Sequence, residues 1–324
     1  MKKRIKPAFV IIAACVILIP AACVIAGIFL NSCKACALYC VDDRAMLSAE
    51  NARERIAPAS LTKLMTSCVA LRYISADEVI TVGTERGLVQ KGSSVSFILP
   101  GHRLKLYDLI SGMLMVSGND AAYTTAVYAA RKVSGEDLSD EQAVEYFCKM
   151  MNDLAAELEM HSSHFANPDG WDDPDHYTTA YDLVKLAEYA LTFPEIREIA
   201  KTQQRFVIFE SSESITWTNS NKLIDPNSRF YCSEAIGLKT GTTKNAGNCL
   251  IGVFVKDGKT YITVTAGCAS DIGRYRKTLK LVDKIDRSAK RNQHEQNRTW
   301  ESRARFLFVK FFYKCSCKIT ENRI

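Results

Sequence analysis

A serine and a lysine three residues apart, Ser60 and Lys63, carry the clearest chemistry in this sequence. They stand at the start of an apolar helical pattern, and Pro58 suits the first turn of such a helix. Side chains at this spacing share one helix face, so the hydroxyl and the amine can come within hydrogen-bonding reach. A neutral lysine can take the serine's proton and make its oxygen a nucleophile. The helix dipole and a second cation would both disfavour the charged ammonium.

Two further motifs follow in order along the chain. Ser117-Gly-Asn119 separates two apolar helical patterns and is predicted to form a turn between helices. Lys239-Thr-Gly241 ends an apolar segment just before a predicted hairpin. The patterns S-x-x-K, S-D-N and K-T-G occur together in penicillin-binding proteins and class A β-lactamases, with the serine of the first as nucleophile. Here the second motif reads S-G-N.

With these motifs the chain resembles the D-alanyl-D-alanine carboxypeptidases, the low-molecular-weight penicillin-binding proteins, in which the S-G-N form is found. The resemblance covers about residues 38–285 and leaves both ends outside. The segments that look like signatures of that family are Ala59–Thr66, Gly92–Ser94, Ser117–Ala122, Phe165–Gly170 and Gly237–Thr243.

The resemblance implies an α+β fold, the penicillin-binding/β-lactamase-like transpeptidase fold, with an antiparallel sheet flanked by helices and a helical subdomain. It also implies a serine-type D-Ala-D-Ala carboxypeptidase. Such an enzyme removes the terminal D-alanine from peptidoglycan stem pentapeptides through an acyl-enzyme, here on Ser60. It needs no cofactor, and β-lactam antibiotics are expected to inhibit it covalently.

The residues of the second and third motifs receive expected roles. A turn between two rigid helices would project Ser117 to relay a proton and Asn119 to donate to the substrate or to Lys63. A strand that edges the cleft could pair with an extended peptide while Lys239 and Thr240 face the nucleophile. Lys239 would then bind the substrate's terminal carboxylate and lower the pKa of Lys63.

The family pattern supplies the remaining site residues. It implies an oxyanion hole formed by the backbone N–H groups of Ser60 and Thr242. It places Gly241 with the substrate-binding strand and Arg274 as a second contact for the substrate carboxylate. The planar fork of an arginine suits that contact, and Arg276 competes for the role.

The elements that must position these residues follow from periodicity and turn chemistry. The residues Asn167, Asp169 and His176, in the loop between the predicted helices 106–158 and 179–191, are interpreted as structural turn residues. The predicted strands are residues 38–41, 45–47, 79–82, 94–98, 235–240, 249–255 and 261–266. The predicted helices are residues 58–73, 106–158 with breaks near 117–119 and 134–137, 179–191 and 271–285.

Composition bounds the rest of the interpretation. With 324 residues, 47% of them hydrophobic and 24% charged, the chain suits one large globular domain or two modest ones. The net charge of +6 is modest, and no nucleic-acid motif accompanies it. The twelve cysteines show no metal-ligand spacing and are interpreted mainly as small core residues, with no metal site expected. Cys249 and Cys268 lie on opposite arms of the predicted hairpin, where they could be neighbours.

The two ends predict export and membrane association. A basic cluster at residues 2–6 precedes an apolar run over residues 7–30, long enough to span a bilayer, so the domain that follows is expected outside the cytoplasmic membrane. Residues 1–37 are therefore a signal sequence or an anchor, and the catalytic domain comprises 38–285. Residues 286–305 are predicted to be a polar linker. Residues 306–324 form a cationic aromatic tail that suits a membrane surface.

Two alternatives stay open at this stage. A β-lactamase shares the three motifs, although the span after Ser117 contains no Glu-x-x-Leu-Asn element of a class A enzyme. A non-catalytic penicillin-binding sensor of the cell wall would retain the pocket without needing the reactive side chains.

Overall fold

The computed structural model describes residues 32–285 of the chain. The chain divides into two compact units, residues 1–279 and 280–324, and the site lies in the first. The predicted linker and tail lie outside the described residues, as does the apolar run at the N-terminus. Within the described range no helix combines the length and the apolar character that crossing a membrane requires.

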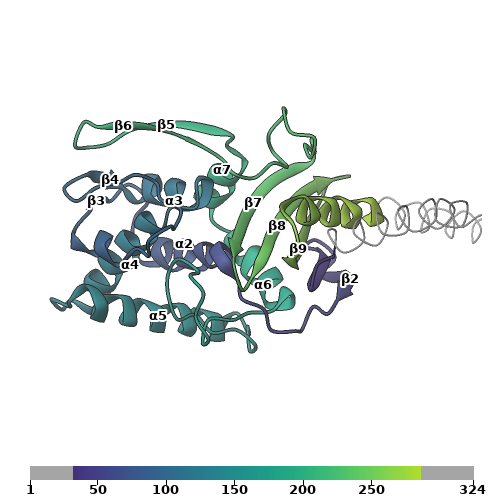
Figure 1. Cartoon of the computed structure of the whole chain (residues 1–324), viewed down its shortest axis with the longest axis horizontal. Helices are drawn as coiled ribbons and strands as arrows, with labels where there is room; N and C mark the ends of the chain where they lie inside the picture. The colour runs from purple at the N-terminus through teal and green to yellow at the C-terminus, as the bar shows by residue number, and fades with distance from the viewer. Residues whose placement is uncertain (1–31, 286–324) are drawn as a thin grey trace, which may run out of the picture. The chain divides into compact units, whose positions relative to one another are not determined.

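A five-stranded antiparallel sheet with the strand order β2-β1-β9-β8-β7 forms one side of the first unit (Figure 1). Its strands are β1 (Ala35–Cys40), β2 (Ala45–Glu50), β7 (Ala235–Thr243), β8 (Gly247–Lys256) and β9 (Lys259–Cys268). Both predicted hairpins and the predicted strand beside the second one are confirmed. The turn between β8 and β9 has positive φ at Asp257 and Gly258, the conformation of a two-residue hairpin.

The first strand begins earlier than the predicted domain boundary. Residues 35–37 are buried in β1, and Ala37 pairs with Val264 of β9. The boundary expected after residue 37 therefore falls inside a strand of the main sheet.

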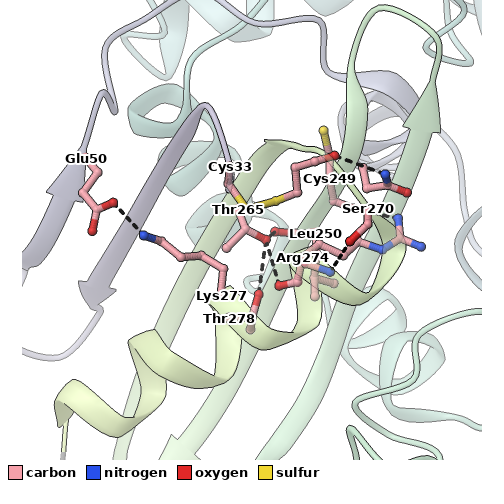
Figure 2. The surroundings of a disulfide bond; sticks show 12 residues. Cys33, Glu50, Cys249, Leu250, Thr265, Ser270, Arg274, Lys277 and Thr278 are labelled. Atoms are coloured by element: carbon pink, nitrogen blue, oxygen red, sulfur yellow. Dashed lines mark hydrogen bonds and ion pairs between the residues drawn. A yellow bond between two sulfur atoms is a disulfide. The ribbon is translucent and has the colours of Figure 1, made fainter. Parts of the chain in front are cut away.

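The two faces of the sheet carry different side chains because successive residues of a strand point to opposite sides. On β9, Ile262, Val264 and Ala266 belong to the hydrophobic core, which they share with α2 and α6. Thr265 points the other way, and its hydroxyl lies 3.2 Å from that of Thr278 on a helix that begins at residue 271 (Figure 2). The same helix reaches β2 through the ion pair of Lys277 with Glu50.

The helices form the other side of the unit. The helix α2 lies at its centre and contacts α3, α4, α5 and α6, and every residue from Thr62 to Ala70 is buried. The predicted breaks at the second motif and near residue 135 are confirmed. Besides the helix that begins at residue 271, the helical segments are η1 (Ala59–Leu61), α2 (Thr62–Tyr73), η2 (Thr84–Leu88), α3 (Leu106–Met115), α4 (Asn119–Ser134), α5 (Asp140–Glu157), α6 (Ala180–Ala190) and α7 (Pro194–Lys201).

One predicted strand is wrong. Residues 94–98 alternate like a strand, but the carboxylate of Asp120 accepts the N–H groups of Ser96 and Ile98 and bends the segment around Phe97. The φ of Phe97 is 62°, outside the strand region. The actual partner of β3 (Val79–Thr81) is β4 (Arg103–Lys105). The structure adds a hairpin that the sequence analysis did not predict, formed by β5 (Gln204–Ile208) and β6 (Ser214–Thr218).

A disulfide joins Cys33 to Cys268, two residues separated by 235 positions (Figure 2). Cys268 ends β9, and Cys33 lies just before β1. Cys249 does lie beside Cys268 in the β8–β9 pairing, where Asn248 pairs with Cys268, but Cys249 is a free, buried cysteine and Cys268 bonds to Cys33. Sequence spacing could not reveal this bridge, because it depends on β1 pairing with β9 at the centre of the sheet.

Candidate active site

The predicted serine and lysine meet where η1 passes into α2. The amine of Lys63 donates to the hydroxyl oxygen of Ser60 over 3.0 Å and to the backbone carbonyl of Asp169 over 2.6 Å. Lys63 is fully buried, whereas Ser60 is half-buried and lines a cleft. The pair thus has the geometry in which an amine can take a proton from a hydroxyl.

A network beneath the serine fixes the turn that presents it. Thr62 donates to the carbonyl of Ala59 over 2.8 Å, and its hydroxyl lies 2.7 Å from Nε2 of His176. Nδ1 of His176 accepts the N–H of Ala166, so Nε2 carries the proton and donates to Thr62. Burial lowers the pKa of His176 to about 4, which keeps the ring neutral. His176 is therefore structural, as expected.

A glycine brings the loop against the same turn. A side chain on Gly170 would lie 1.9 Å from the carbonyl oxygen of Ala59, and the φ of Gly170 is +87°. Only glycine allows this approach without moving the backbone. Ala59 itself has a φ of 51°, an uncommon value for a residue with a side chain. The packing between the loop and η1 thus holds Ala59, the residue before the nucleophile, in a conformation that the chain would otherwise avoid.

The pKa of Lys63 is lowered toward neutral pH, as a general base requires. Burial lowers its pKa to about 8, against the charges of Asp169 and Asp120, which raise it. An ammonium loses hydration when it is buried, so the neutral amine becomes accessible near physiological pH.

The second motif faces the third across the site. Ser117 lies in the turn between α3 and α4 with a φ of 63°, and its hydroxyl accepts a hydrogen bond from the amine of Lys239 over 3.1 Å. Lys239 also donates to the carbonyl of Thr240 and is buried. Burial lowers its pKa well below the usual value, and the charges of Lys63 and Arg274 act in the same direction. The second and third motifs are therefore in direct contact through the hydrogen bond between Lys239 and Ser117.

Strand β7 runs directly beside the nucleophile turn. A Cβ on Gly241 would lie 2.9 Å from the backbone nitrogen of Ser60, so glycine allows the strand to approach the serine. The hydroxyl of Thr240 lies 3.0 Å from that of Ser220. This arrangement brings the N–H of Ser60 close to the end of β7, where Thr242 also lies.

Arg274 reaches the end of β7 from the helix that begins at residue 271 (Figure 2). Its guanidinium donates to the carbonyls of Gly241 and Cys249 over 3.0 and 3.2 Å and to the hydroxyl of Thr242 over 3.1 Å. It also forms an ion pair with Asp271. Arg274 is buried, and its hydrogen bonds hold the end of β7 in place.

The cleft beside Ser60 has a volume of about 180 Å³. Ser60, Asn119 and Thr242 line it, whereas Lys63, Ser117 and Lys239 are not among its lining residues. The complete lining consists of Ser60, Gly92, Ser93, Ser94, Asn119, Asp169, Gly170, Trp171, Asp172, Thr242, Thr243 and Lys244.

Asp169 belongs to the site although it was interpreted as a turn residue. Besides holding Lys63 through its carbonyl, it accepts a hydrogen bond from the amide nitrogen of Asn119 through its carboxylate. A second carboxylate oxygen accepts the N–H of Trp171, which is the turn role that was expected. The signal in the sequence was its place in the signature segment at residues 165–170.

Comparison with known proteins agrees with this geometry. The family model of the D-alanyl-D-alanine carboxypeptidases matches residues 33–270. The chain is 28% identical over 256 residues to D-alanyl-D-alanine carboxypeptidase DacF of Bacillus subtilis, covering 78% of this chain and 62% of that protein. It is 33% identical over 251 residues to DacD of Escherichia coli, covering 73% and 58%. The chain thus spans about 60% of the length of these relatives.

Solved structures show the same fold. The Streptomyces K15 DD-transpeptidase superimposes with a TM-score of 0.71 at 26% identity, covering 78% of this chain and 95% of that one. D-alanyl-D-alanine carboxypeptidase DacD from Francisella tularensis superimposes with a TM-score of 0.67 at 26% identity, covering 77% and 69%. The expected fold class is confirmed, and the chain belongs to the D-alanyl-D-alanine carboxypeptidase family.

Proposed function

We propose that the protein is a serine-type D-Ala-D-Ala carboxypeptidase that acts on peptidoglycan stem peptides through an acyl-enzyme on Ser60. One observation carries the proposal: the fully buried amine of Lys63 lies 3.0 Å from the hydroxyl oxygen of Ser60. The names of the relatives support the substrate class.

In the acylation step, neutral Lys63 takes the proton of Ser60 while the serine oxygen attacks the carbonyl carbon between the two terminal D-alanines. The negative oxygen of the tetrahedral intermediate is stabilised by the N–H groups of Ser60 and Thr242. When the C–N bond breaks, the leaving D-alanine amine takes the proton that Lys63 accepted from Ser60, which Ser117 relays. Water then hydrolyses the ester on Ser60 and restores the free enzyme.

The far side of the site receives the end of the substrate. Lys239 supplies a cation for the terminal carboxylate, and Thr240, Gly241 and Thr242 line the strand along which the peptide extends. A bound carboxylate favours the ammonium form of Lys239, so the substrate itself opposes the effect of burial on this group. Arg274 supports the same region through its bonds to the end of β7.

The disulfide supports an extracytoplasmic location for the folded domain. Disulfides persist in oxidising compartments and are rare in the cytosol of mesophilic cells. Export on the basic and apolar N-terminal segment, followed by action at the membrane surface, agrees with the Cys33–Cys268 bridge.

Mass spectrometry of the full-length protein after penicillin treatment tests the proposal. We expect one penicilloyl adduct, located on Ser60, and none in Ser60→Ala. Ser93→Ala is the matched control, because it removes another hydroxyl from the cleft lining and should still be acylated. Equal labelling of Ser60→Ala would contradict the proposal.

A second assay separates the enzyme from its alternatives. A carboxypeptidase releases D-alanine from a pentapeptide and keeps its penicilloyl adduct for a long time. Rapid turnover of nitrocefin would identify a β-lactamase. An adduct on Ser60 without any release of D-alanine would identify a penicillin-binding sensor.

A further inference from the structure

The loop residue Asp169 contacts both Lys63 and Asn119, the first with its backbone and the second with its side chain. Its backbone carbonyl accepts the amine of Lys63 over 2.6 Å, and its carboxylate accepts the amide N–H of Asn119. The side chain is 1% exposed and lines the same cleft as Ser60. A structural turn would need only the bonds within the loop, such as that to the N–H of Trp171.

The contact with Asn119 fixes the orientation of an amide. An ionised carboxylate accepts hydrogen bonds and cannot donate them, so the NH₂ end of Asn119 must face Asp169. The NH₂ group has two donors, so one stays available to a ligand in the cleft that Asn119 lines. The amide oxygen takes the opposite direction. Without the carboxylate, the amide could rotate and present either end to a substrate.

We propose that Asp169 is a positioning residue that fixes the base Lys63 and the substrate-binding amide of Asn119 in place relative to each other. The proposal rests on the proposed function, because it assigns Lys63 the role of base. It differs from that function in its subject, which is a loop residue outside the three motifs.

The negative charge of Asp169 has a second effect on Lys63. It favours the ammonium form and raises the pKa of the amine, against the larger effect of burial. Asp120 on α4 acts in the same direction from the other side, with its carboxylate bound to Ser96 and Ile98. The charge of Lys63 acts in turn on Lys239 of β7 and lowers its pKa.

Two further groups complete the surroundings of the base. His176 is neutral above about pH 5, because burial lowers its pKa to about 4. The charge of Arg274 acts on Lys239 and lowers its pKa. His176 does not change its charge between pH 6 and 9, so it contributes no midpoint in that range.

The test measures the rate at which the full-length protein reacts with a fluorescent penicillin as a function of pH. In the wild type, the rate should rise through a midpoint near pH 8, because only the neutral amine of Lys63 accepts the serine proton. In Asp169→Asn, the midpoint should move down by roughly one pH unit, the size typical of a nearby charge. The maximum rate should also fall, because an amide at position 169 can present either its oxygen or its NH₂ group to Asn119 and no longer fixes the orientation of that side chain.

Two controls separate charge from structure. Asp169→Glu keeps the charge but displaces the carboxylate, so its maximum rate should fall while its midpoint stays within a few tenths of the wild type. Asp175→Asn removes an exposed carboxylate from the same loop and should change neither quantity. If Asp169→Asn folds poorly, Asp169→Ala provides the same comparison.

The outcomes distinguish the inference from the function on which it rests. A midpoint of Asp169→Asn equal to that of Asp175→Asn would overturn the inference, while the acylation of Ser60 in the wild type would still stand. A wild type that does not react with penicillin at any pH, or that reacts equally well as Ser60→Ala, would overturn the proposed function itself.

Discussion

The helical side and the sheet side of the site each contribute one fully buried lysine, and their surroundings differ. Lys63 on α2 has the carboxylates of Asp169 and Asp120 near it, and these oppose the effect of burial. Lys239 on β7 has the cations of Lys63 and Arg274 near it, and these add to the effect of burial. The same side chain at the same depth thus meets opposite electrostatic environments.

This difference explains how two lysines in one site can have different tasks. A base must change its charge state near the working pH, so its pKa has to lie close to that pH. A carboxylate receptor needs a partner that completes its surroundings, and the substrate supplies that negative charge. In the empty site, the negative charges of Asp169 and Asp120 therefore already act on Lys63. The charges that act on Lys239 are cations, so this site favours the binding of an anion.

The largest expected effect comes from a change on the helical side. Lys63→Arg keeps a cation of similar length, but a guanidinium does not deprotonate in proteins and cannot act as the base. The rate of acylation by penicillin should fall about 10²- to 10⁴-fold, the usual contribution of a general base. Stopped-flow labelling measures this rate, and a loss of less than tenfold would show that Lys63 is not the base.

A change on the sheet side should be smaller and should affect binding. In the proposed function Lys239 supplies the cation for the substrate carboxylate, and Lys239→Ala removes this bond, worth about 1.5–3 kcal/mol. The KM for D-alanine release should rise about 10- to 100-fold, since each 1.4 kcal/mol is a factor of ten. A peptide with a C-terminal carboxamide is the control. Wild type and variant should handle it alike, and an equal loss on both peptides would remove Lys239 from carboxylate binding.

The smallest expected effect on activity comes from removing the disulfide between Cys33 and Cys268. Cys33→Ser should lower the free energy of unfolding by about 2–4 kcal/mol, because the bridge restricts the unfolded chain. The acylation rate should change less than twofold, since the helical side holds Ser60 and Lys63 without it. Denaturant titration and labelling measure the two quantities, with the half-buried free Cys232→Ser as control. A large loss of acylation would show that the sheet positions the nucleophile.

Much of the site could be predicted because its residues belong to short local patterns. Ser60 and Lys63 are one helical turn apart, and the turn at Ser117 and the strand at Lys239 follow from the hydrophobic periodicity around them. The β8–β9 hairpin was predictable for the same reason, since Asp257-Gly258 favours the turn that joins it.

The rest depends on contacts between distant residues. Residues 94–98 have the alternation of a strand, but a carboxylate on α4 takes their N–H groups, and no local pattern reveals that competitor. Asp169 reads as a turn residue because half of its role belongs to its backbone carbonyl. Arg274 was expected at the substrate, and its bonds to the end of β7 depend on how the helix after β9 lies against the sheet.

The bridge between Cys33 and Cys268 closes the intervening chain into a single covalent ring that contains all the residues assigned to the site except Arg274. A protease that cuts one loop inside this ring opens it without separating the fragments. The nicked protein would migrate as one species until a reductant divides it, so the residues assigned to the site stay joined after a first cut.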